Sequence, residues 1–180
     1  MPFVALLKET GERIDITQVE YPKQKYQYGD CVCQLCEAPL RIRGGTYVRN
    51  HFAHDPSTPC NTDYSSQPES PHHREAKYFL LERLRKEFPE YKYAEIRCEV
   101  KIPEIKRVVD VFVTFPTGWK QAHEIQLTGI TTNELEERTN DYEKAGIDVV
   151  WWLGKSAASD TNRRWCIERF GSCFTLNFSA

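Results

Sequence analysis

The chain has 180 residues and a mass of 21.0 kDa, which suits one domain or one domain with a small appended module. Apolar residues make up 40% of it and charged residues 28%, and this composition excludes a wholly disordered chain. The formal net charge of −2 gives no overall sign of nucleic-acid binding, although residues 108–150 are more acidic than the segments on either side.

The N-terminal residues carry neither a basic lead nor a long apolar region, so we expect no secretion signal. The longest apolar stretch, Val149–Leu153, has the length of a strand, so we expect no membrane-spanning helix and no membrane partner. Together these features predict a cytoplasmic protein.

Residues 1–65 are predicted to form a hairpin followed by a metal-binding module. Strand-like runs at Phe3–Leu7 and Arg13–Ile16 flank the turn pair Thr10-Gly11, as in a hairpin or two edge strands. The chain has seven cysteines and no export signal, which argues against disulfides and for a metal site. Four of the cysteines and two histidines fall in one short segment: Cys31, Cys33, Cys36, His51, His54 and Cys60.

The spacing in this segment favours a structural zinc site formed by Cys33, Cys36, His54 and Cys60. A two-residue gap lets both thiolates of one turn reach the same tetrahedral ion. The segment is too short to bury a core of its own, so a metal would explain its folding. Six candidates compete for four places: Cys31 could replace Cys33, and His51 could replace His54 or Cys60. Buried thiols with hydrogen-bonded histidines are the alternative to a metal.

Residues 66–180 are predicted to form an α/β domain after a linker at residues 61–71, which holds no aliphatic side chain. Ser70 and Pro71 begin a helix that runs to about Phe88, before Pro89. A capping-box pattern at Thr131 and Glu134 begins a second helix. The predicted elements of this part are the helix 70–88, strands at 93–102, 107–115 and 119–127, a helix 131–146, a strand 147–153, a short helix 163–170 and a strand 173–178. Such an order is typical of a sheet with helices on its faces.

Two carboxylates are predicted to meet on neighbouring strands. The turn Pro116-Thr117-Gly118 resembles a three-residue hairpin loop with glycine at the position of positive φ. This loop pairs Phe115 with Trp119, and the ladder then places Asp110 directly across from Glu124. Side chains so placed can bind one divalent ion, and without an ion their charges would repel. Two solvated carboxylates on an exposed face are the alternative.

Basic side chains of the two longer helices are predicted to point towards this pair. At helical spacing, one meridian of the first helix carries His73, Lys77, Leu80 and Leu84. One side of the second helix carries Leu135, Arg138 and Tyr142. Because the leucines should face the core, the polar residues beside them should also point inward, which favours a functional site.

The chain resembles the competence protein CoiA-like family over nearly its whole length. The segments that carry the resemblance are Cys33-x2-Cys36, His51-Phe52-Ala53-His54, Glu69-Ser70-x2-His73-x3-Lys77, Arg107-x2-Asp110-Val111, Glu124-Ile125-Gln126, Arg138-x3-Tyr142-x3-Gly146 and Val150-Trp151-Trp152-Leu153. Members join an N-terminal zinc-finger-like module to a nuclease-like domain of the restriction-endonuclease type, PD-(D/E)xK. The resemblance implies a mixed sheet flanked by helices, preceded by a small zinc-ribbon-like module, with DNA as the partner.

Carried over to this sequence, the resemblance makes Asp110 and Glu124 the ligands of a catalytic Mg²⁺ or Mn²⁺, with the Ile125 carbonyl as a further candidate. Gln126 stands where the nuclease signature has lysine, and Lys77 could supply the missing positive charge. Lys77 or Gln126 would orient the attacking water, and His73 would give a ligand or a proton. The remaining candidates would contact DNA or its phosphates: Arg107, Arg138 and Tyr142.

A metal-dependent DNA nuclease, acting in competence, recombination or defence, is therefore the preferred hypothesis. A catalytically weak or inactive DNA-binding module that acts with recombination proteins is the second, because Gln126 departs from the signature. An accessory protein whose modules serve only protein contacts is the third. DNA binding that weakens with salt, without cleavage, would favour the second hypothesis.

Overall fold

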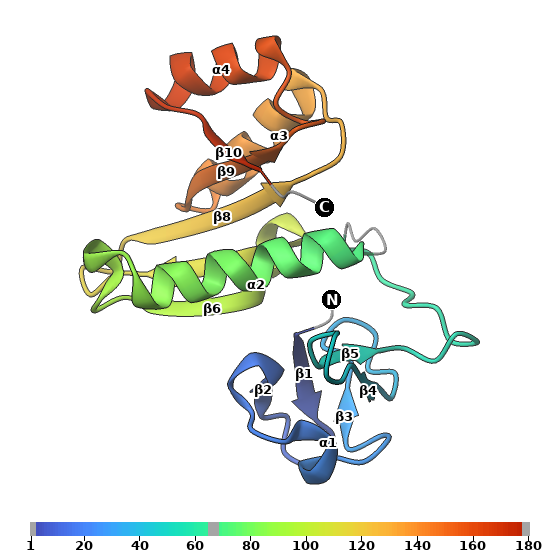
Figure 1. Cartoon of the computed structure of the whole chain (residues 1–180). Coiled ribbons are helices and arrows are strands. Elements are labelled where there is room, and N and C mark those ends of the chain that lie inside the picture. Colours follow the sequence, from blue (N-terminus) through green and yellow to red (C-terminus); the bar gives the residue numbers. More distant parts are fainter. Residues whose placement is uncertain (1–2, 65–68, 178–180) are drawn as a thin grey trace. The chain divides into compact units, whose positions relative to one another are not determined.

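The computed structural model describes residues 3–64 and 69–177 and divides the chain into two units, residues 1–69 and residues 70–180 (Figure 1). The predicted boundary after residue 65, and part of the predicted linker at 61–71, lie outside the described residues. Within the described residues, no helix is both long enough and apolar enough to cross a bilayer.

Unit 1 begins with the predicted hairpin. Strands β1 (Val4–Leu7) and β2 (Arg13–Asp15) pair antiparallel with Ala5 opposite Ile14, on either side of a turn where Gly11 has φ +71°. Strand β3 (Cys31–Val32) pairs with the other edge of β1. Between β2 and β3 lie a 3-10 turn, η1 (Ile16–Gln18), and a single helical turn, α1 (Pro22–Lys25). Of the two predicted arrangements, the structure has the hairpin.

A second hairpin of unit 1 consists of β4 (Arg41–Arg43) and β5 (His51–Ala53). Its central pair is Ile42 and Phe52, and Phe52 is 2% exposed, so this face of the hairpin packs inward. The apolar core of the unit is small; its buried members include Phe3, Val4, Ala5, Ile14, Ile16, Cys31, Leu40 and Phe52.

Unit 2 follows the predicted order of helix, three strands, helix, strand, helix and strand. Its elements are α2 (Pro71–Lys86), η2 (Pro89–Tyr91), β6 (Glu95–Ile102), η3 (Pro103–Ile105), β7 (Arg107–Thr114), β8 (Lys120–Gln126), α3 (Thr132–Lys144), β9 (Asp148–Gly154), α4 (Asp160–Phe170) and β10 (Phe174–Leu176). The sheet order is β10-β9-β8-β7-β6. Strands β6, β7 and β8 are antiparallel, whereas β8, β9 and β10 are parallel, so the sheet is mixed.

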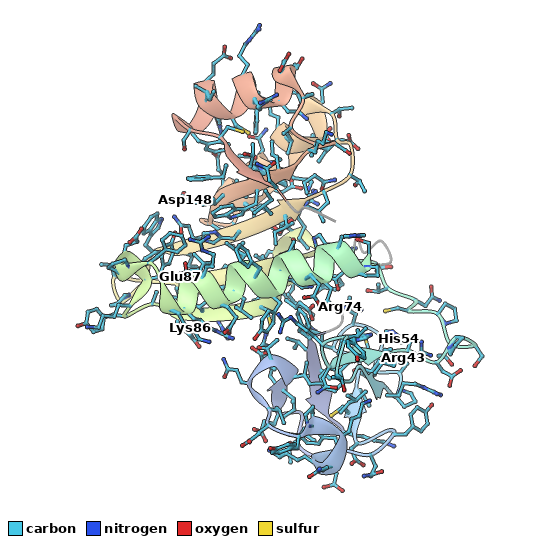
Figure 2. All side chains as sticks on the ribbon, viewed as in Figure 1. Arg43, His54, Arg74, Lys86, Glu87 and Asp148 are labelled. Atoms are coloured by element: carbon cyan, nitrogen blue, oxygen red, sulfur yellow. The ribbon has the colours of Figure 1, made fainter. Side chains whose placement is uncertain are left out.

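Helix α2 begins as its sequence predicts. The Ser70 hydroxyl accepts a hydrogen bond from the His73 N–H, and Pro71 occupies the first helical position. The helix ends at Lys86, with Glu87 as its C-cap, two residues before the predicted end (Figure 2). It lies against β6, β7 and β8, and its buried aliphatic residues are Ala76, Leu80, Leu81 and Leu84.

The β7–β8 turn has the predicted register. The Phe115 N–H donates to the Trp119 carbonyl over 2.8 Å, and Gly118 has φ +84°. Glycine adopts this left-handed conformation without the steric cost that a Cβ would bring. Phe112 then pairs with Ala122, but the ladder ends at Val111 and His123, one position before the predicted pairing of Asp110 with Glu124.

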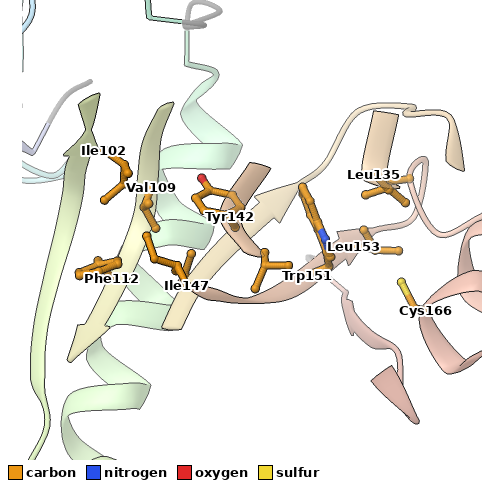
Figure 3. Close-up of a cluster of buried hydrophobic side chains, with 12 residues drawn as sticks. Ile102, Val109, Phe112, Leu135, Tyr142, Ile147, Trp151, Leu153 and Cys166 are labelled. Atoms are coloured by element: carbon orange, nitrogen blue, oxygen red, sulfur yellow. The ribbon is translucent and has the colours of Figure 1, made fainter. Parts of the chain in front are cut away.

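Helix α3 begins with the predicted capping box, in which the Thr131 hydroxyl and the Glu134 carboxylate each accept a backbone N–H of the other residue. It contacts β9 and closes a second apolar core (Figure 3). The labelled members of that core are Ile102, Val109, Phe112, Leu135, Tyr142, Ile147, Trp151, Leu153 and Cys166.

The C-terminal elements differ slightly from expectation. Helix α4 begins at Asp160, three residues before the predicted start, because Ser159 accepts the Asn162 N–H as N-cap. It ends at Phe170, and Gly171, with φ +77°, is its C-cap. Strand β10 is shorter than the predicted strand 173–178, of which Phe178 lies outside the described residues.

His123 is a buried histidine of the sheet that must stay neutral. It is 0% exposed; Nδ1 accepts from Trp152 Nε1 at 3.1 Å, so Nε2 carries the proton and donates to Gln121 Oε1 at 3.1 Å. Burial lowers the pKa of His123 from 6.5 to about 3.

We therefore expect stability to fall on acidification. The unfolded chain takes up a proton at His123 below pH 6.5 and the folded chain does not until about pH 3, so this stabilisation is present above pH 6.5 and is lost as the pH falls towards 3. The loss should be up to about 1.4 kcal/mol per pH unit. Urea unfolding at pH 7 and pH 5 measures it through tryptophan fluorescence, because all 4 tryptophans lie in unit 2. His123→Gln should flatten this pH dependence; an unchanged slope would contradict the assignment.

Candidate functional site

The site of unit 2 lies where strands β7 and β8 separate. Their pairing runs from Thr114 and Lys120 to Val111 and His123 and ends there, although β8 stays paired with β9 through Gln126. At the next position the side chain of Asp110 replaces the missing backbone partner: its Oδ2 accepts the Ile125 N–H over 2.9 Å. A carboxylate is thus built into the sheet at the point where the ladder opens.

His73, in the first turn of α2, reaches into this opening. Its Nε2 lies 3.1 Å from Asp110 Oδ2 and 3.0 Å from the Ile125 carbonyl oxygen. Both of these neighbours are acceptors, so Nε2 carries a proton that it shares between them. The imidazole therefore stands between two oxygens that the sequence analysis assigned to a metal ion.

These contacts keep Asp110 ionised. Burial by itself would raise its pKa, but the charges of His73 and Lys77 and the hydrogen bonds from His73 and the Ile125 N–H lower the pKa of Asp110 to about 2. Asp110 therefore carries its negative charge throughout the neutral range, as a metal ligand or a partner of cations must.

Glu124 is buried, 4% exposed, and is held by α3. Tyr142 Oη donates to Glu124 Oε1 over 2.5 Å, and the Arg138 guanidinium forms a salt bridge with the other carboxylate oxygen. Burial raises the pKa of Glu124; Arg138 acts against this, and the charge of Asp110 adds to it. Glu124 is therefore held in place by two residues of α3, one of which is positively charged.

Arg138 and Gln126 belong to the same network. The Arg138 guanidinium lies over the Trp151 ring, 4.7 Å from its centroid, and also donates to Gln126 Oε1 at 3.2 Å. The Gln126 amide donates to the Thr128 carbonyl and hydroxyl, each at 3.0 Å. Gln126 is thus held by both ends of its amide.

The structure adds one residue that sequence reasoning missed, Glu99 of β6. Lys77 Nζ donates to Glu99 Oε1 over 2.5 Å, and the two side chains are only 2% and 1% exposed. The β6–β7 register brackets Glu99 opposite Asp110, since Cys98 pairs with Val111 and Val100 with Val109. Glu99 has φ +50°, a strained conformation for this residue type, and interrupts the ladder there. The sequence did contain one signal for Glu99: it is an acidic residue between the apolar residues Cys98 and Val100 of a predicted strand.

Two predicted DNA contacts have other partners. Tyr142 is 0% exposed and donates to Glu124, so it positions that carboxylate and cannot reach DNA at the surface. Arg107 pairs with Asp141 through Nε at 3.1 Å and through its terminal nitrogen at 2.6 Å. The structure therefore gathers Asp110, Glu124, His73 and Lys77, while Arg107 is held at the start of β7 by α3.

Unit 1 contains the predicted Cys/His cluster. The ligand atoms of Cys33, Cys36, His54 and Cys60 lie within 4.8 Å of one another, and within residues 3–64 and 69–177 this is the one group of three or more such ligands placed to hold a metal ion. Cys36 Sγ is 3.3 Å from His54 Nε2, and Cys33 Sγ is 3.8 Å from Cys60 Sγ. This donor set suits zinc.

The turn that carries the first two cysteines is formed by the backbone. The Cys33 N–H donates to the Ala38 carbonyl, the Glu37 N–H donates to the Cys33 carbonyl, and the Leu35 N–H points to Cys33 Sγ at 3.4 Å. Burial raises the pKa of Cys33, and raises that of Cys60 to about 12 with a contribution from Cys33. Without a cation these thiols stay protonated, and a bound metal would reverse that preference.

The two alternative ligands lie elsewhere. Cys31 is 2% exposed, belongs to β3 and pairs with Leu7, and burial together with Asp30 raises its pKa to about 11. His51 Nδ1 is 2.8 Å from the Arg49 carbonyl oxygen, and its strand neighbour Phe52 takes the inward face. Neither residue joins the cluster.

The Lys77–Glu99 pair yields a stability prediction. Lys77→Met or Glu99→Leu alone leaves a buried charge without its partner and should cost about 3–5 kcal/mol of unfolding free energy. The double variant removes both charges and should recover most of that loss. Urea unfolding followed by tryptophan fluorescence measures all three. Additive losses in the double variant would mean that the two charges are not coupled.

Comparison with known proteins assigns both units. A family model described as competence protein CoiA, nuclease-like domain, matches residues 69–180, and a model described as competence protein CoiA, N-terminal domain, matches residues 14–63. No curated protein and no solved structure matches the chain. Because the nuclease-like model alone covers more than half of the chain, the protein belongs to the competence protein CoiA family.

Proposed function

We propose that unit 2 is a metal-dependent DNA nuclease of the PD-(D/E)xK type that processes DNA in competence or a related pathway. The observation that carries the proposal is the opening of the sheet at Asp110, which, like Glu124, directly follows the last paired position of β7 and β8. An ionised carboxylate that is mostly removed from water is costly for stability, and a second carboxylate in the same site adds to the cost, so a site that retains both favours a chemical role.

The donors around this opening fit a hard divalent cation. Asp110 Oδ2 and the Ile125 carbonyl oxygen converge on one point, now held by His73 Nε2 at 3.1 and 3.0 Å. Oxygen donors of this kind are those that Mg²⁺ and Mn²⁺ prefer. In this proposal Glu124, now held by Tyr142 and Arg138, would turn towards the ion as the third donor. When bound, such an ion polarises a phosphodiester and lowers the pKa of an attacking water.

Lys77 is our candidate for the positive charge that the nuclease signature places at Gln126. Gln126 is fixed by Thr128 and Arg138, whereas Lys77 carries a buried charge that lowers the pKa of Asp110. Glu99 holds the Lys77 ammonium in place over 2.5 Å. In this proposal Lys77 orients the attacking water, and Glu99 is a positioning residue that acts through it.

His73 and Arg138 complete the proposed mechanism. His73 holds a proton at Nε2 beside Asp110 and can give it to the leaving oxygen. The Arg138 side chain is 24% exposed, and its guanidinium can share its charge between Glu124 and a phosphate. Both residues thus bring positive charge to the place where negative charge develops during phosphodiester hydrolysis.

The test is cleavage of plasmid and of single-stranded DNA with Mg²⁺ or Mn²⁺. Asp110→Asn and Glu124→Gln should lower the rate at least about 100-fold, because each removes a charge that would bind the ion. Asp160→Asn and Glu137→Gln make the same chemical changes at exposed positions and should cut at the wild-type rate. If Asp110→Asn and Glu124→Gln also cut at that rate, the nuclease assignment fails.

The double variant Lys77→Met/Glu99→Leu separates the chemistry from the fold. If the double variant folds, we expect it to lose DNA cleavage. Normal cleavage by the folded double variant would show that Lys77 has no role in the mechanism. Lys86→Met is the matched control, since Lys86 lies on the same helix with its side chain 68% exposed.

A DNA-binding module without cleavage is the second candidate, and the network around Glu124 favours it. The site already pairs its carboxylates with His73, Arg138 and Lys77, so it can satisfy them without a divalent ion. Such a module would act through DNA and through recombination proteins. Metal-dependent nicking that disappears in Asp110→Asn would exclude it.

We further propose that Cys33, Cys36, His54 and Cys60 bind one structural zinc ion. Cys36→Ser should lower the zinc content from about one per chain to well below half and make residues 1–69 sensitive to protease, because the metal stabilises a unit with a small core. Cys31→Ser is the matched control and should keep its zinc, since Cys31 lies outside the cluster. Elemental analysis measures the zinc content of both variants and of the wild type. Equal zinc content in Cys36→Ser and the wild type would refute the assignment.

A further inference from the structure

The β4–β5 hairpin of unit 1 carries a segregated positive charge. Residues 38–54 contain no Asp or Glu, while Arg41, Arg43 and Arg49 fall among them, together with His51 and His54. Acidic residues occur directly outside this segment, at Glu37 and Asp55. The net charge of the whole chain is −2, but every charged residue of this segment is basic. The β4–β5 hairpin therefore has the positive potential of an anion-binding surface.

The strand register places the basic residues on the outer face. Ile42 pairs with Phe52, whose burial fixes the inward face, so Arg43 and its partner His51 share the outward face. Arg43 is exposed and can be followed in Figure 2, where His54 is labelled beyond the end of β5. Arg41 lies on the same outward face, but its charge is paired with Asp55. Arg43 lies nearer the tip of the hairpin than Arg41.

The tip of the hairpin presents an aromatic ring to solvent. The Gly45 N–H donates to the Val48 carbonyl over 2.7 Å and closes a tight turn, and Tyr47 within that turn is 99% exposed. Gly44 has φ +124°, and a Cβ there would lie 2.6 Å from the Arg49 carbonyl oxygen, so only glycine fits. Lys23 Nζ donates to the Gly44 carbonyl over 2.5 Å and adds a further positive charge at the tip.

A second aromatic residue continues this surface. Tyr28 is 58% exposed, and the Arg41 guanidinium lies over its ring at 5.3 Å from the centroid. Alternating cationic and aromatic groups are the chemistry of surfaces that bind single-stranded nucleic acid, where bases stack on rings and phosphates meet Lys and Arg. Duplex DNA offers its phosphates to such a surface but keeps its bases stacked, so the open face of Tyr47 favours an unpaired strand.

We propose that the β4–β5 hairpin is a binding site for single-stranded nucleic acid, in which Tyr47 stacks against a base and Arg43, Arg49 and Lys23 contact phosphates. This site belongs to unit 1 and uses none of the residues of the proposed nuclease site. It therefore adds a second contact with nucleic acid and stands whether or not unit 2 cleaves DNA.

The experiment measures binding of a labelled oligonucleotide of about 20 nucleotides by fluorescence anisotropy. The protein is the full zinc-loaded chain carrying Asp110→Asn, without added Mg²⁺ or Mn²⁺, so that cleavage does not interfere. Tyr47→Ala should weaken single-strand binding about 5- to 50-fold, because one stacked base is lost. Tyr93→Ala, which removes another exposed tyrosine (78% exposed), this one from unit 2, should bind as before.

The charge contribution is tested by salt titration. Arg43→Ala/Arg49→Ala should reduce the slope of log K against log salt by about 1.4, the value for two phosphate contacts on a single strand. Lys92→Ala/Lys120→Ala removes the same charge from exposed positions of unit 2 and should leave the slope unchanged.

Three outcomes would overturn the proposal. Wild-type affinity in both hairpin variants would show that the nucleic acid binds elsewhere. Equal affinity for a duplex of the same length would remove the stacking role of Tyr47. Tighter binding to anionic lipid vesicles or to an acidic peptide than to the single strand would assign the hairpin to another partner. Zinc content equal to that of the parent chain shows that each variant keeps the fold of unit 1, and DNA cleavage by the wild-type chain is scored separately.

Discussion

The hydrogen bond from the Ile125 N–H to the Asp110 carboxylate is the contact on which the architecture of unit 2 depends. Two neighbouring strands of a sheet normally satisfy each other's backbone groups, and an N–H left unpaired in the interior is costly. Here a side chain satisfies it, so β7 and β8 can separate and still leave no buried donor unpaired at that position. The separation gives His73 its access to the middle of a sheet that would otherwise be closed.

Charge balance around this opening follows from the same constraint. Two buried carboxylates, those of Glu99 and Glu124, and the partly exposed carboxylate of Asp110 meet three basic side chains, those of Lys77, His73 and Arg138. An ion pair of this kind contributes little to stability, but removal of one member leaves a charge that the interior cannot solvate. Entry of a divalent cation would therefore have to displace a basic side chain, and a phosphate is an acceptor that such a displaced group can bind.

The sequence predicted those parts of the site whose geometry is local. The Pro116–Gly118 turn fixes the β7–β8 register, and helical spacing fixes which residues of α2 and α3 point inward. Glu99 was missed because β6 and β7 are joined through the 3-10 turn η3, and Lys106, with φ +50°, follows it; neither has a register that can be counted from sequence. Tyr142 was expected to contact DNA because its partner also depends on non-local packing. Helical periodicity shows only that Tyr142 faces inward, and the structure is needed to show that its hydroxyl donates to Glu124.

The Cys/His module shows the same division between local and non-local information. Spacing could not choose between His51 and His54, but strand alternation can, because Phe52 takes the inward face and leaves His51 outside. The contact of Cys36 with His54 then closes the chain on both sides of the β4–β5 hairpin. A hairpin whose base is fixed by the cluster loses less conformational entropy when it binds a ligand, since its outward face is already ordered. The cluster thus supplies the rigidity, and the residues between its ligands remain available for recognition.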